Sequence, residues 1–99
     1  MATKKSSVVE TLLADRTKTH GVFANHAVMA QTLKRTMRED EDGLTTEAWT
    51  ALDDDMAEAL EMIQHKIARV LNGDPQHIDH WDDICGYSKL VADRLRKEA

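Results

Sequence analysis

The stretch TEAWTALDDDMAEALEMIQHKIARVL, residues 46–71, decides the fold because its apolar side chains recur at spacings of three and four. The residues in this series are Trp49, Leu52, Met56, Leu60, Ile63, Ile67 and Val70. Such spacing places them along one side of an α-helix. The pattern therefore predicts one long central helix from about Thr46 to Leu71.

The four residues that follow, NGDP at 72–75, predict a tight turn. Gly73 supplies a left-handed residue that ends the central helix, and Asp74 with Pro75 supplies an N-cap and a first-turn proline for the next helix. Two long helices joined so closely must run antiparallel. We expect this helical hairpin to pack through Leu60, Ile63, Ile67, Ile84, Val91 and Leu95.

Upstream of the hairpin, the sequence predicts two further helices and no strand. The expected segments are a helix from Ser6 or Ser7 to about Asp15, a loop at 16–21, a helix from about Val22 to Arg38 and a charged connector at 39–43. The fold class is all-α, a bundle of four helices. Residues 1–99 form a single helical domain, with residues 1–5 expected to be disordered.

The composition and charge of the chain argue against several classes of function. The net charge of −5 disfavours a DNA-binding or RNA-binding surface, which needs clustered Lys and Arg. The single Cys85 excludes an intramolecular disulfide and a cysteine-based zinc site, and it suits a reducing cytoplasm. No apolar run is long enough to span a membrane, and the N-terminus does not read as a signal peptide. We expect a cytoplasmic protein that contacts no membrane.

Glu58, Glu61, His65 and Arg69 share one stripe of the central helix. Two carboxylates at i, i+3 with a histidine one turn later suit a divalent ion such as Mg²⁺ or Mn²⁺. The same stripe lies nearly opposite the apolar one, so the alternative is a solvated helix face with pairs such as Glu61–His65.

The last helix carries a second candidate face. Its apolar side is formed by Ile78, Trp81, Ile84, Cys85, Ser88, Val91, Ala92 and Leu95. Asp79 and Asp83 point away from it on a stripe that continues through Gly86, Tyr87 and Leu90. Glycine inside a helix costs about 1 kcal/mol relative to alanine, unless something packs closely there. This stripe is either an interface or ligand surface, or an exposed helix face.

Other motifs are weaker. His65, His77 and His80 lack the spacing of a zinc site, and His20 beside Gly21 is typical of a loop. Neither a Ser/His/Asp signature nor a phosphate-cradling glycine loop is present.

The pair Glu58-x-x-Glu61, followed about 17 residues later by Asp79 and Asp83, resembles the pattern of the MazG-type all-α nucleoside triphosphate pyrophosphatases. In that family four acids from a helical hairpin hold Mg²⁺ against the phosphates of a nucleotide. The resemblance implies that Glu58, Glu61, Asp79 and Asp83 are metal ligands and catalytic residues. It also implies that Lys66 and Arg69 contact phosphate and that Tyr87 stacks on the base. The alternative for Lys66 and Arg69 is ion pairing with Asp79 and Asp83 across the hairpin.

A closer resemblance is to small bacteriophage-encoded MazG-like proteins of largely uncharacterised function. It is carried by Lys66-Ile67-Ala68-Arg69, Asp79-x-Trp81-x-Asp83-Ile84-x-Gly86-Tyr87 and Arg16-x-x-x-His20-Gly21. It implies a Mg²⁺-dependent nucleotide-binding protein, with hydrolysis to monophosphate and pyrophosphate as one possibility. The rival is a non-catalytic accessory protein in the host cytoplasm that sequesters a nucleotide signal or blocks a host defence protein. A homodimer or larger homo-oligomer is expected through Gly86, Tyr87 and Leu90.

Overall fold

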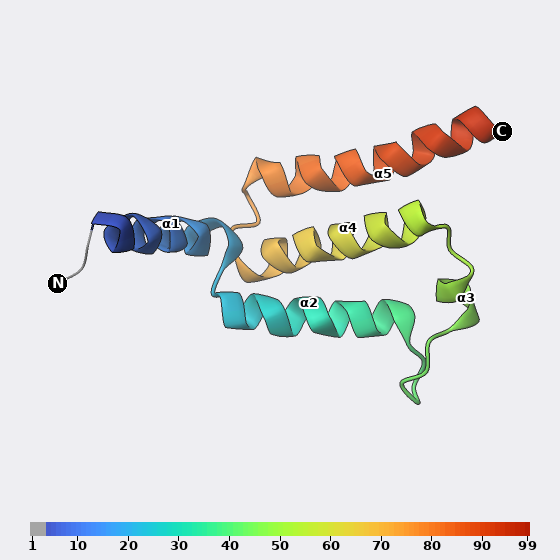
Figure 1. Ribbon diagram of the computed structural model, residues 1–99, viewed down its shortest axis with the longest axis horizontal. Coiled ribbons are helices and arrows are strands. Elements are labelled where there is room, and N and C mark those ends of the chain that lie inside the picture. Colours follow the sequence, from blue (N-terminus) through green and yellow to red (C-terminus); the bar gives the residue numbers. More distant parts are fainter. Residues whose placement is uncertain (1–3) are drawn as a thin grey trace.

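The computed structural model describes residues 4–99, and it describes side chains from residue 8 onward. The described chain is helical, with one isolated β-bridge between Glu39 and Thr45 (Figure 1). Its elements are α1 (Lys4–His20), α2 (Phe23–Arg38), α3 (Glu47–Thr50), α4 (Asp54–Asn72) and α5 (Ile78–Glu98). The all-α prediction is confirmed. No described helix has the length and apolar character needed to cross a lipid bilayer.

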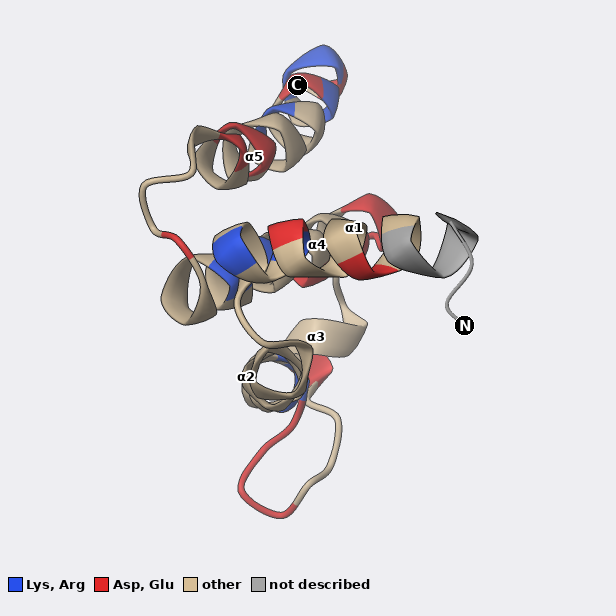
Figure 2. Ribbon diagram, turned by 90° about the vertical axis from the view of Figure 1, so that its left-hand side faces the viewer, with Lys and Arg blue, Asp and Glu red and all other residues tan. Residues whose placement is uncertain are grey.

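Helices α2, α4 and α5 form one layer with α4 in the middle, and α1 projects from one end of that layer (Figures 1 and 2). Helix α4 is antiparallel to both neighbours, so the tight turn after α4 produces the predicted antiparallel hairpin. The radius of gyration is 17.0 Å, whereas a compact domain of this length has about 13 Å. The chain is therefore an elongated layer and not a closed four-helix bundle.

The predicted central helix is interrupted between Thr50 and Asp54, which separates the one-turn α3 from α4. Thr46 caps α3 by accepting a hydrogen bond from the backbone N–H of Trp49 at 3.2 Å. Asp53 then adopts an extended conformation and α4 starts afresh, with Asp54 and Asp55 in its first turn, where carboxylates favour the helix dipole. Periodicity alone did not reveal this break, because the apolar spacing continues across it.

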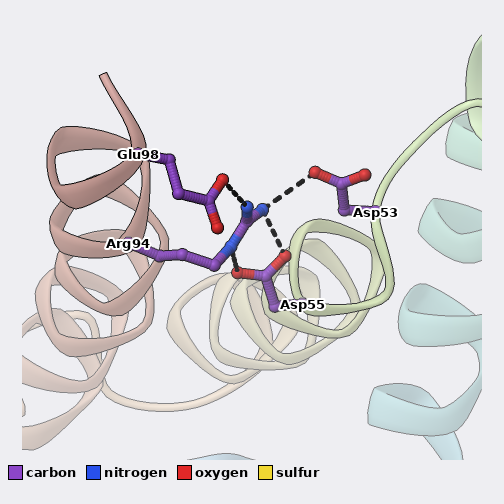
Figure 3. Close-up of polar contacts among 4 residues, drawn as sticks. All are labelled: Asp53, Asp55, Arg94 and Glu98. Carbon is purple, nitrogen blue, oxygen red and sulfur yellow. Dashed lines mark hydrogen bonds and ion pairs between the residues drawn. The ribbon is translucent and has the colours of Figure 1, made fainter.

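Arg94 on α5 fixes the start of α4, as Figure 3 shows. Its guanidinium donates two hydrogen bonds to Asp55, one of them 2.7 Å long, and donates at 2.9 Å to both Asp53 and Glu98. These contacts lower the pKa of the Asp55 carboxyl, chiefly through its hydrogen bond to Arg94. Asp53 and Asp55 thus close the open end of the hairpin through their contacts with Arg94.

Helix α1 is longer than predicted at both ends. It contains Lys4 and Lys5, which were expected to be disordered, while residues 1–3 lie outside the described chain. It also continues through residues 16–20 of the predicted loop, and the Thr17 hydroxyl donates to the Leu13 carbonyl within the helix at 2.9 Å. Gly21, with φ +81°, ends it.

The turn between α4 and α5 also differs in detail from the prediction. Gly73 has φ −126° and is not left-handed, and α5 begins at Ile78 instead of at Pro75. The Asp74 carboxylate accepts a hydrogen bond from the backbone N–H of Gln76 at 2.9 Å, so it caps a turn and not a helix. The side chains of the turn thereby delay the start of α5.

This turn packs backbone to backbone against the turn between α1 and α2. The Thr19 carbonyl accepts hydrogen bonds from the Asp74 backbone at 3.0 Å and from the Nε2–H of buried His80 at 2.9 Å. Asn72 donates to the Val22 carbonyl at 3.1 Å. These bonds attach the end of α1 to the hairpin and hold the elements that surround the cavity described below.

The apolar core is thin. Within the described residues, the buried apolar side chains are Ala30, Ala59 and Ala68. The packing set expected for the hairpin is half-exposed or exposed throughout: Leu60, Ile67 and Leu95 are exposed, and Ile63, Ile84 and Val91 are only partly covered. One side of the α4–α5 hairpin therefore remains open.

Candidate functional site

The four predicted metal ligands are distributed over separate contacts. Glu61 forms an ion pair with Arg38 of α2 at 3.2 Å, and Asp83 forms one with Lys66 at 3.0 Å. Asp79 lies 3.5 Å from the Nε2 of its neighbour His77, while Glu58 is exposed. Two of the four acids are therefore already neutralised by cations of the same chain.

Within residues 4–99, no three or more acids, histidines or cysteines are grouped closely enough to hold a metal ion. Mg²⁺ prefers near-octahedral oxygen ligands, which usually include one or two carboxylates together with water and phosphate. The acids as arranged in one chain do not fit that requirement, so we derive no chemical step through a metal.

The ion pair between Lys66 and Asp83 agrees with the alternative in which the cations of α4 pair with the aspartates of α5. Lys66 is only 8% exposed, and its ammonium group needs a counter-ion at that depth. The hydrogen bond from Lys66 holds the pKa of the Asp83 carboxyl below its usual range. Arg69, by contrast, pairs with neither aspartate. The two predicted phosphate-binding cations thus have different roles, and only Arg69 remains available.

Arg69 faces a cavity of about 410 Å³ where the end of α1 meets the start of α2 and the second half of α4. Its lining consists of Leu13, Arg16, Thr17, His20, Gly21, Phe23, His26, His65 and Arg69. The volume is within the range of small-molecule sites, about 300–1,000 Å³. The lining contains two guanidinium groups and no carboxylate. In a chain with net charge −5, this is a locally cationic site.

Arg16 and Arg69 form no ion pair with any described carboxylate. Burial lowers the pKa of Arg69, Asp83 raises it, and the nearby Arg16 lowers it by a smaller amount. Arg16 is exposed and Arg69 is partly buried, so the two guanidinium groups lie at the mouth and in the wall of the cavity.

The histidines around the cavity are neutral at pH 7. Burial and the charge of Arg69 lower the pKa of both His20 and His65 to about 4, and the same two causes lower that of His26. Neutral imidazoles offer a hydrogen-bond donor and an acceptor. His26 is only 6% exposed, yet its Nδ1 has no hydrogen-bond partner among the described residues. Buried polar atoms are nearly always paired, so this unpaired nitrogen is an exception among the residues that line the cavity.

Two aromatic side chains lie near the cationic groups. Phe23 lines the cavity and is 80% exposed, with its ring stacked 6.4 Å from that of His26. Tyr87 of α5 is close enough to Arg69 to raise its pKa slightly, and it lines a separate open hollow on α5 beside Asp83 and Gly86. An exposed aromatic face beside guanidinium groups suits a planar ring as a stacking partner.

The sequence identified only some of the residues that line this cavity. Arg69, His65 and Arg16-x-x-x-His20-Gly21 had been singled out, but Phe23 and His26 had not. His26 begins a series with Ala30, Leu33 and Met37 at spacings of four, three and four, which forms a regular stripe along α2. A histidine within an apolar stripe was the signal that could have identified it.

Comparison with known proteins gives one family. Residues 6–95 match the model described as a domain of unknown function, DUF6378. No curated protein and no solved structure matches the chain. The matched segment includes α2, α3 and α4 in full and most of α1 and α5. It also includes every residue that lines the cavity. The chain belongs to the DUF6378 family.

Proposed function

We propose that the protein binds a nucleotide in the cavity between α1, α2 and α4, with its phosphates held by Arg16 and Arg69. The observation that carries the proposal is the pair of guanidinium groups in a cavity without a carboxylate. Guanidinium groups bind phosphate oxygens through charge-assisted, often bidentate hydrogen bonds. The unpaired Nδ1 of His26 adds a buried polar contact.

The start of α2 supports the same assignment. Its N-cap, Val22, has no side-chain acceptor, and its first turn contains no acid. The positive end of the helix dipole therefore stays uncompensated next to Phe23, which lines the cavity. Exposed Phe23 provides a surface on which the base stacks, while the neutral histidines provide donors and acceptors for its polar edge.

Binding without turnover is favoured over hydrolysis. Phosphoanhydride cleavage needs neutralisation of the phosphate oxygens and a positioned water, for which Mg²⁺ on carboxylates is the common solution. Here Glu61 and Asp83 are paired with Arg38 and Lys66 instead. The protein then acts by sequestering its nucleotide, which corresponds to the accessory function that the phage resemblance implies. A host protein as a further partner remains an expectation of that resemblance.

The test is isothermal titration with inorganic phosphate and with a panel of nucleoside mono-, di- and triphosphates. We expect Arg16→Gln and Arg69→Gln each to weaken nucleotide binding about tenfold to a hundredfold, because each removes a charge-assisted hydrogen bond. The matched control is Arg96→Gln, since Arg96 is exposed on α5 and pairs only with Asp93 of its own helix. Equal affinity in all three variants would refute the site.

Hydrolysis is tested separately, by pyrophosphate release from nucleoside triphosphates in the presence of Mg²⁺ or Mn²⁺. On the present proposal no release is expected, and Glu61→Gln or Asp83→Asn leaves nucleotide affinity unchanged. Release that these two variants abolish would instead support the hydrolase that the MazG-type resemblance implies. In that event the acids must rearrange, or meet those of a second chain, when the nucleotide binds.

A further inference from the structure

The accessible surface of the chain is large for a monomer of its mass. It is 7,437 Å², whereas a compact monomer of 11.2 kDa exposes about 5,700 Å². The excess of about 1,700 Å² exceeds the roughly 800 Å² that each partner contributes to a standard interface, and falls within the range of obligate homodimers. The buried apolar core of the described chain consists of three alanines. Much apolar surface of the single chain is therefore free to be covered by a partner.

Many of the exposed apolar side chains lie on one side of the α4–α5 hairpin. A groove of about 290 Å³ between α4 and α5 is lined by Leu52, Met56, Ala59, Leu60, Ile63, Ser88 and Val91. On α4 the same stripe continues to Ile67, which is exposed. On α5, Trp81 and Leu95 are each seven residues from Ser88, a spacing that returns to the same side of a helix, and both are exposed. We call this surface the apolar hairpin face.

We propose that a second copy of this chain covers the apolar hairpin face. The residues that define the face carry no charge, so two chains of net charge −5 can meet there without bringing like charges into contact. The surface area in excess matches what a dimer needs, and a two-fold pair uses the same patch on both chains.

The proposed interface differs from the one predicted from the sequence. Gly86, Tyr87 and Leu90 lie on another side of α5, and an added Cβ at Gly86 would meet nothing within 4 Å in this chain. The apolar hairpin face also lies away from the cationic cavity. Leu60 and Arg69 are nine residues apart on α4, which at about 100° per residue places them on opposite sides of the helix. Each chain of the dimer therefore keeps its own cavity open.

The first test is the mass of the wild-type protein by light scattering and sedimentation, together with its melting temperature as a function of concentration. We expect a mass about twice the 11.2 kDa of one chain at micromolar concentration. The melting temperature should rise with protein concentration, because folding and association are coupled. A monomer at 100 μM with concentration-independent melting would overturn the proposal.

The second test locates the interface with two matched leucines. Leu60 is 39% exposed on the apolar hairpin face, and Leu90 is 69% exposed on the other side of α5. Leu60→Ala should weaken dimerisation about tenfold, whereas Leu90→Ala should leave it unchanged. Leu60→Lys should prevent dimerisation, and because folding and association are coupled it should also lower the melting temperature. A dimer sensitive to Leu90→Ala and insensitive to Leu60→Ala would overturn the assignment. Because mass is the readout, failure of nucleotide binding leaves this test unaffected.

Discussion

Gly73→Ala is expected to destabilise the protein by about 3 kcal/mol or more, because a Cβ at this position has no space. It would overlap the Thr19 carbonyl oxygen and would lie 2.6 Å from the carbonyl carbon of His20 and 2.8 Å from the nitrogen of Gly21. All three are backbone atoms that side-chain rotation cannot move. Chemical denaturation should show the loss as a lower midpoint, with α1 detached or the whole chain unfolded.

Gly21→Ala should be at least as harmful. Its Cβ would overlap the Asn72 carbonyl, and its φ of +81° costs a residue with a side chain about 1–2 kcal/mol in addition. Gly43 distinguishes the backbone strain from the steric overlap, because it has φ +78° but nothing within 4 Å of an added Cβ. Gly43→Ala should therefore cost only the backbone strain.

The control is Gly86→Ala in the middle of α5, where an added Cβ meets nothing. This substitution should raise the free energy of unfolding by about 1 kcal/mol, because alanine favours the helix. If Gly73→Ala and Gly86→Ala had similar effects, the turn-to-turn contact would not exist in solution.

The second large effect is a loss of stability in mild acid. The pKa values of His20 and His65 are about 4 in the folded chain, that of His26 is also lowered, and an unfolded histidine titrates near 6.5. Between these values the unfolded chain binds more protons than the folded one. The stabilisation is complete above pH 6.5 and is lost as the pH falls towards 4. After allowing for solvent around these partly exposed rings, we expect a loss of about 2 kcal/mol between pH 7 and pH 5.

The surroundings of the histidine rings lower their pKa values. The pKa of His65 is lowered by burial, then by Arg69, His26, Lys66 and Lys34, and no described carboxylate opposes these effects. His20 is affected by burial and then by Arg69, His80 and Lys66, with an opposing hydrogen bond at Thr19. A cation added to such a ring is strongly disfavoured. The carboxyl groups of Asp55 and Asp83 do not interfere, because their lowered pKa values affect stability only below about pH 4.

Melting temperatures at pH 7.5 and pH 5 measure this effect, and a domain of this size should lose roughly 10 °C. The double variant His20→Gln, His65→Gln should flatten the profile, since glutamine does not titrate. Saturating phosphate should also reduce the slope, because an anion beside Arg69 favours the protonated rings. A wild-type protein equally stable at both pH values would contradict the neutral state of the histidines.

The sequence by itself determined the helical class, the antiparallel hairpin and the approximate ends of α2. These features follow from local causes: apolar spacing along a helix, a turn of Asn-Gly-Asp-Pro, and glycine at residue 21. Local signals failed where a distant partner decides. The break before Asp54 depends on Arg94, about forty residues away, and the late start of α5 depends on how Asp74 folds back on its own turn.

Only the tertiary structure decided which charges are free. Glu61, Lys66 and Asp83 belonged to the predicted site, but their partners lie on neighbouring helices and neutralise them. Arg16, His26 and Arg69 are separated by 10 and 43 residues in sequence and meet because two glycine turns bring the ends of α1, α2 and α4 together. Helical periodicity indicates which side chains share one helix face. It contains no information about which neighbouring helix presents a counter-ion to that face, and that is a property of packing.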